Sequence, residues 1–172
     1  GNIKTNYHNG AIQADSVTTA NPNFLAMYGM EWGVISGGGH VVIYGDNMND
    51  LWGWESGSGT WGPTNNYDVF VPKSVYRGSN GLFKTVNDNI ASKTFATLAH
   101  PNLLDYNKLD TSYDAIADNA IVGTAVESGP AFSTNTTYSN PGSSLSYLYY
   151  YQLMLAKGYH IGPTVDHDNH NT

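Results

Sequence analysis

The sequence predicts an α/β fold built around a parallel sheet. Short apolar runs recur along the chain, and in the second half they alternate with stretches of helical periodicity. Alternating strands and helices form parallel sheets. Several apolar runs end in an acidic residue or a histidine. In α/β barrels, side chains at the carboxyl ends of the strands meet at one face, so a barrel with its site at that face is expected.

Composition limits the classes of protein to consider. At 172 residues the chain fits one domain, residues 1–172, with a substantial core. The net charge of −7 makes nucleic acid a poor partner. No apolar run reaches the roughly 18 residues of a membrane span. Cysteine is absent, which excludes disulfides. Low charge with many Asn, Ser, Gly and Tyr residues is typical of bacterial secreted, periplasmic or surface proteins.

The first third contains two predicted strands. Residues 1–23 are polar, Asn9-Gly10 predicts a turn, and His8 is at most a possible site residue. The apolar run 24–28 predicts a buried strand that is followed by Glu31. A glycine-rich loop then leads to His40 and a second strand at 41–44. Glu31 and His40 can therefore meet across a short loop.

Residues 46–67 predict a long loop that contains Trp52, Trp54 and Trp61. Long loops in compact domains are usually functional or disordered, and three tryptophans argue against disorder. The indole rings either pack against the domain or line a pocket that stacks on a sugar. A carbohydrate-binding or surface module is therefore the alternative to an enzyme.

The second half predicts helices at 68–92, 106–119 and 141–157, on periodicities such as Leu82, Phe83, Val86 and Ile90. Strands are predicted at 94–99, 120–126 and 159–165. The first of these ends at His100-Pro101, where proline stops the strand and restricts His100 to an extended backbone. The second ends at Glu127, a possible ligand.

The last strand leads into Asp166-His167-Asp168-Asn169-His170. On an extended chain, side chains two residues apart share a side. Asp168 and His170 can therefore present a carboxylate oxygen and an imidazole nitrogen to one ion, a donor set that suits zinc, manganese or iron. Asp166 lies on the same side and deeper, as a possible partner of the ligands, and His167 faces away.

These segments resemble the PHP domain, the polymerase and histidinol phosphatase family of metal-dependent phosphoesterases. The resemblance lies in Gly29-Met30-Glu31-Trp32, Gly39-His40-Val41, Leu98-Ala99-His100-Pro101-Asn102, Val126-Glu127 and the sequence from Gly162-Pro163-Thr164 to His170. It implies a distorted seven-stranded (β/α)7 barrel with two or three zinc, manganese or iron ions. It implies that Glu31 bridges two metals, that His40 and His100 bind the second, Asp168 the first and His170 the third. Glu31, His100 and Asp168 would be the catalytic residues.

The resemblance implies hydrolysis of a small-molecule phosphoester. The family also opens with a His-x-His pair, which does not occur before Glu31, and ends with a helix that is missing here. The chain is therefore expected to lack the first strands of the barrel. Either another chain or a missing N-terminal segment of the same polypeptide supplies them, or the site is incomplete. A domain that has lost catalysis and serves as a scaffold is a further alternative.

Overall fold

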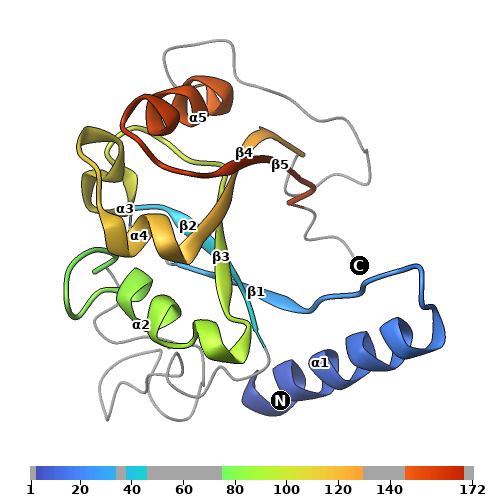
Figure 1. The fold of residues 1–172 in the computed structure, drawn as a ribbon. Helices are drawn as coiled ribbons and strands as arrows, with labels where there is room; N and C mark the ends of the chain where they lie inside the picture. The colour runs from blue at the N-terminus through green and yellow to red at the C-terminus, as the bar shows by residue number, and fades with distance from the viewer. Residues whose placement is uncertain (1–2, 34–37, 46–74, 130–145, 169–172) are drawn as a thin grey trace.

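A computed structural model describes residues 3–33, 38–45, 75–129 and 146–168. In this part of the chain, five strands form one sheet in the order β1-β2-β3-β4-β5 (Figure 1). The strands are β1 (Gly29–Trp32), β2 (His40–Tyr44), β3 (Phe95–Ala99), β4 (Ile121–Ser128) and β5 (Gly162–Asp166).

The predicted (β/α)7 barrel is wrong, because the sheet is open and mixed. β1 pairs with β2, and β2 with β3, in antiparallel register, whereas β3, β4 and β5 are parallel. Only seven residues, 33 to 39, connect β1 to β2. A connection of that length cannot make the crossover that parallel neighbours need, so the two strands form a hairpin.

The core lies on one face of the sheet. Val41, Ile43, Ala96 and Leu98 are completely buried and alternate with half-buried residues along β2 and with Thr97 on β3. They form one cluster with side chains of α2 (Leu82–Asp88), α4 (Ala115–Ala120) and α5 (Tyr147–Ala156), namely Leu82, Phe83, Val86, Ala117, Ala120, Tyr150 and Met154. Side chains of a strand alternate between faces, so His40, Val42 and Tyr44 point to the opposite face.

Residues 3–20 form a helix, α1 (Ile3–Ala20), which lies apart from the other helices near β1 (Figure 1). The predicted turn at Asn9-Gly10 is therefore wrong. Gly10 is buried, and a Cβ atom at this position would come within 2.3 Å of the Tyr28 ring. Glycine is needed here for close packing of the helix, not for a turn.

The strand predicted at 24–28 lies five residues further along, at β1. Residues 24–28 have no regular structure, and Phe24, Leu25 and Met27 are largely exposed. Local hydrophobicity is therefore higher beside the strand than in it. The other predicted strands agree with β2, β3, β4 and β5 within a few residues, and the helix predicted to end before Gly158 is α5.

The two other predicted helices are shorter than expected. Of 68–92, residues 68–74 lie outside the described part, and only α2 and a 3₁₀ turn, η2 (Ile90–Ser92), are helical beyond them. The stretch 106–119 contains α3 (Asp105–Lys108), a 3₁₀ turn η3 (Leu109–Thr111) and α4. Within α3, Tyr106 and Asn107 have left-handed backbone angles, which is unusual for residues with a side chain. The Asn107 side-chain oxygen accepts the N–H of Tyr76 at 2.7 Å and holds this turn in place.

Candidate metal centre

Three predicted ligands meet where the ends of β1 and β3 lie beside the beginning of β2. Glu31 is near the end of β1, His40 is the first residue of β2, and His100 follows directly after β3. Because β2 runs opposite to its neighbours, its beginning lies beside their ends. The predicted convergence of these residues is therefore present, although the sheet is not the expected one.

The donor atoms are close together. His40 Nδ1 lies 2.9 Å and His100 Nε2 lies 3.1 Å from the same oxygen, Glu31 Oε1. The two imidazole nitrogens are 3.3 Å apart. Adjacent ligands of a tetrahedral ion at 2.0–2.1 Å are roughly 3.3–3.4 Å from each other. The three atoms therefore already have about the spacing of one face of such a coordination sphere.

These contacts shift the ionisation of the group. Hydrogen bonds from His100 and His40 hold the pKa of the Glu31 carboxyl far below its usual range, against the opposing effect of burial. The hydrogen bond to Glu31 also raises the pKa of His100, with burial opposing it. Without a metal ion, the pair is therefore a carboxylate beside an imidazole that tends to keep its proton.

The same geometry favours a cation at the centre. An ionised carboxylate only accepts hydrogen bonds, so each imidazole must donate an N–H hydrogen bond to Glu31 Oε1. The two N–H groups then lie beside each other, with their nitrogens 3.3 Å apart. A metal ion would replace both protons and use both nitrogen lone pairs. One carboxylate oxygen and two imidazole nitrogens form a set of donors that zinc, manganese and iron accept.

Two buried tyrosines hold the chain that carries His40. The hydroxyl of Tyr76 donates to the carbonyl of Gly39 at 2.6 Å, and the N–H of Tyr106 donates to the carbonyl of Gly38 at 2.7 Å. Gly39 has a φ of +114°, and a Cβ atom there would lie 2.4 Å from the Tyr106 ring. Glycine is thus required at position 39 for both conformation and space.

A hollow of about 230 Å³ opens beside the group. Glu31 and His100 line it together with Asp166, His167 and Asp168 from the end of β5. Burial raises the pKa of the half-buried Asp166 carboxyl, and its Oδ2 atom is buried without a hydrogen-bond partner in the structure. Unpaired buried oxygens are costly, so this oxygen is suited to accept a hydrogen bond from a donor in the hollow.

Two details of local backbone differ from the expectations. His100 has a φ of +28°, so the following proline does not keep it extended; the chain turns sharply where it leaves β3. β5 ends at Asp166, and Asp168 has a φ of +49°, so strand alternation does not extend to Asp168. His167, which was expected to face away, lines the hollow as well. His170 lies outside the described residues.

Other predicted site residues lie elsewhere or outside the described part. His8 is exposed on α1, and Glu127 is exposed on β4; neither belongs to the described group or lines the hollow. Trp52, Trp54 and Trp61 fall in residues that the structure does not describe, so a sugar-binding role for them stays a prediction. Sequence reasoning missed Tyr76 and Tyr106, because neither lies in a recognisable ligand pattern.

Comparison with protein-family models, curated proteins and solved structures finds no match to this chain. In the described part of the chain, no helix has the length and apolar character needed to cross a membrane.

Proposed function

We propose that this chain is a metal-dependent hydrolase of small-molecule phosphoesters, as its resemblance to the PHP family implies. The observation that supports this most is the convergence of Glu31, His40 and His100, whose donor atoms lie within 4.8 Å of one another. Sites with two imidazoles and one carboxylate are common for catalytic zinc, because three protein ligands leave a position open for water or substrate.

The residues of the site divide into two groups with different tasks. Glu31, His40 and His100 would hold the ion, which when bound supplies Lewis-acid activation of the ester and of water. Asp168 and His167 also line the hollow, where a carboxylate or an imidazole can accept the proton of an attacking water. Asp166 lines it as well, as a further acidic side chain that can orient the ligands.

Metal content and activity test this proposal together. Purified protein is loaded with zinc, manganese or iron, its metal content is measured, and phosphate release from p-nitrophenyl phosphate is followed. Activity should require metal and disappear with chelator. Glu31→Gln and His100→Asn should each lower bound metal to background, because each removes a donor atom from a set of three.

His160→Asn provides a matched control. Its Nδ1 atom also contacts a carboxylate, Asp118 Oδ2 at 2.9 Å, but His160 lies before the start of β5, at the opposite end of the strand from the residues that line the hollow, and its side chain is 85% exposed. This variant should keep both metal and activity. Phosphate release that persists in chelator would overturn the proposal, and bound metal without hydrolysis would favour a domain that has lost catalysis.

A further inference from the structure

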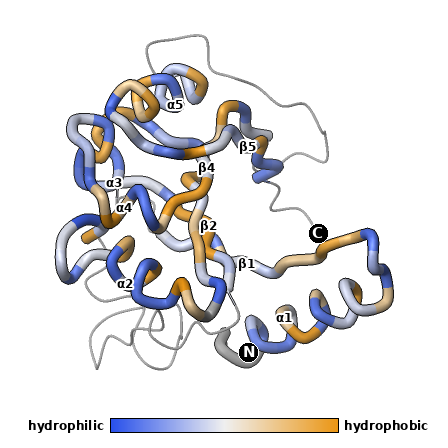
Figure 2. The backbone as a smooth tube through the Cα atoms, viewed as in Figure 1, coloured by the Kyte–Doolittle hydropathy of each residue, from blue (hydrophilic) through white to orange (hydrophobic). Residues whose placement is uncertain are grey.

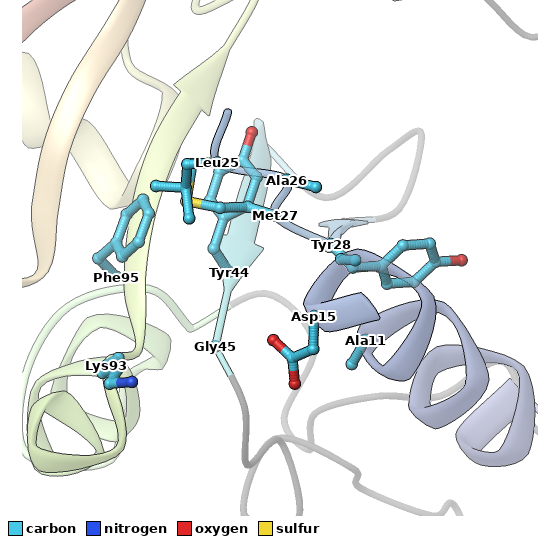
Figure 3. Close-up of a pocket in the computed structure, with 11 residues that line it drawn as sticks. Ala11, Asp15, Leu25, Ala26, Met27, Tyr28, Tyr44, Gly45, Lys93 and Phe95 are labelled. Atoms are coloured by element: carbon cyan, nitrogen blue, oxygen red, sulfur yellow. The ribbon is translucent and has the colours of Figure 1, made fainter. Parts of the chain in front are cut away.

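A second hollow of about 230 Å³ lies between α1, the segment 24–28 and the open face of the sheet. Figure 3 shows the side chains around it, which come from four separate parts of the chain. They include Asp15, Leu25, Met27, Tyr28, Tyr44 and Phe95. The metal centre does not use this hollow, and none of the proposed ligands lines it.

Aromatic and aliphatic groups dominate its walls. Tyr44 and Phe95 are partners in the β2–β3 ladder, and their rings stack with centroids 5.0 Å apart and planes inclined by 21°. Leu25 and Met27 are 67% and 53% exposed above them. Figure 2 shows the segment between α1 and β1 as a hydrophobic stretch on the outside of the molecule. Contiguous exposed apolar groups of this kind mark binding sites.

The wall formed by α1 is fixed to the sheet. The buried Tyr7 hydroxyl lies 3.2 Å from the carbonyl oxygen of Tyr28 and 3.1 Å from that of Gly45. The Tyr7 and Tyr28 rings pack edge to face at 5.2 Å. Gly10 adds close contact, since any side chain there would collide with Tyr28. The hollow is therefore formed before a ligand arrives, as is usual for small-molecule sites.

Tyr44 connects this hollow to the metal centre, because it lines both. Glu31 pairs with Val42 in the β1–β2 ladder, and Tyr44 is two residues further along the same face. Two residues of strand span about 7 Å. A group held at Glu31 and a ring lying against Tyr44 and Phe95 therefore fit within one small molecule, with Val42 beneath the atoms that join them.

We propose that the second hollow binds the aromatic group of the ester whose phosphoryl group lies at the metal centre. The inference rests on the proposed function, and it narrows the substrate class to esters of phosphate with an aromatic alcohol. The stacked rings of Tyr44 and Phe95 favour a flat ring over a branched chain. The volume is below that of a pocket for a drug-sized ligand, which suits one or two fused rings.

Equilibrium binding tests the inference independently of turnover. Zinc-loaded protein is titrated with the non-hydrolysable phosphonate analogues of 1-naphthyl phosphate, followed by naphthyl fluorescence, and of methyl phosphate, followed by calorimetry. The naphthyl analogue should bind at least about tenfold more tightly, because its ring loses contact with water. Leu25→Asp and Met27→Asp should remove most of this preference and leave binding of the methyl analogue and metal content unchanged. Both side chains are exposed, so these substitutions are compatible with folding.

Leu155→Asp is the matched control, since Leu155 is also exposed, at 42%, but lies on α5. It should behave as the wild type. Equal affinity for the two analogues, or equal loss of both affinities in the variants, would overturn the inference. Self-association of the wild type that Leu25→Asp abolishes, seen by sedimentation, would also overturn it and identify the hollow as a contact between copies. Selective binding without hydrolysis of either ester would support the hollow while overturning the phosphoesterase proposal.

Discussion

The Tyr106 hydroxyl oxygen lies 3.0 Å from the main-chain oxygen of His40 and 3.0 Å from that of Ala99. Ala99 directly precedes His100, so one buried phenol contacts the backbone of both strands that supply imidazole ligands. Burial raises the pKa of this phenol well above its usual value, so it remains a proton donor. The positions of His40 and His100 therefore depend on a group that lies outside the proposed set of ligands.

We expect Tyr106→Phe to weaken zinc binding by roughly 10–100-fold, as other losses of ligand-supporting hydrogen bonds do. The ring and its packing are retained, so the effect reports the hydroxyl. Affinity is measured by competition with a zinc chelator. Tyr159→Phe is the control, because its hydroxyl also donates to a carbonyl, that of Ser112 at 3.0 Å, away from the ligands. Equal losses in both variants would contradict a specific role for Tyr106.

Gly39→Ala should reduce both stability and zinc affinity. The new methyl group would collide with the Tyr106 ring, and the φ of +114° is unfavourable for alanine. Gly38→Ala separates the two causes, since φ is +84° there but no atom lies within 4 Å of the new Cβ. The unfavourable backbone conformation alone costs alanine about 1–2 kcal/mol of stability. Urea unfolding should show a larger loss for Gly39→Ala than for Gly38→Ala; equal losses would mean that Tyr106 moves aside freely.

The ion pair between Glu31 and His100 should give metal-free protein a characteristic pH profile. The pKa of His100 is raised, so its contribution to stability is complete below its ordinary pKa of 6.5 and is lost as pH rises through the folded value. The pKa of Glu31 is lowered, so its contribution is complete above its ordinary pKa of 4.5 and is lost as pH falls through the folded value. Both contributions to stability are therefore complete between pH 4.5 and 6.5.

The measurement is thermal unfolding in chelator from pH 3 to 9 for wild type and Glu31→Gln. Other groups titrate in both proteins, so the difference between the two curves isolates this pair. The difference should be greatest between pH 4.5 and 6.5. A difference that is flat over the whole range would show that the ionisation of this pair does not contribute to folding.

Asp114 should contribute to stability through a helix cap. Its Oδ1 atom accepts the N–H groups of Ile116 and Ala117 at the start of α4, and its Oδ2 atom accepts from Arg77 Nε at 3.0 Å. Asp114→Ala should lower the free energy of unfolding by about 0.5–2 kcal/mol. Asp114→Asn keeps a capping oxygen and should recover most of this loss in urea unfolding. Identical values for the two variants would mean that the ion pair, and not the cap, stabilises the helix.

The sequence predicts the strands with continuous apolar runs and the residues that follow them, which is why Glu31, His40 and His100 could be expected at one edge. Strand direction is not encoded in hydrophobicity. The short connection before His40 indicates a hairpin, and this indication is stronger than the alternation that predicts a parallel sheet. The predicted position of β1 is wrong because Leu25 and Met27 are apolar yet exposed beside α1. The position of the Tyr106 side chain depends on a left-handed turn that no local sequence pattern indicates.

The order of the strands makes the three ligands a link between two parts of the fold. Glu31 and His40 belong to the β1–β2 hairpin. His100 lies 60 residues after His40 in the sequence and follows β3, the first of the three parallel strands. A bound ion would therefore act as a cross-link that closes a long loop and restricts local opening of the hairpin. In amide hydrogen exchange, removal of the metal should release protection in β1 and β2 first, while β4, between two parallel neighbours, stays protected.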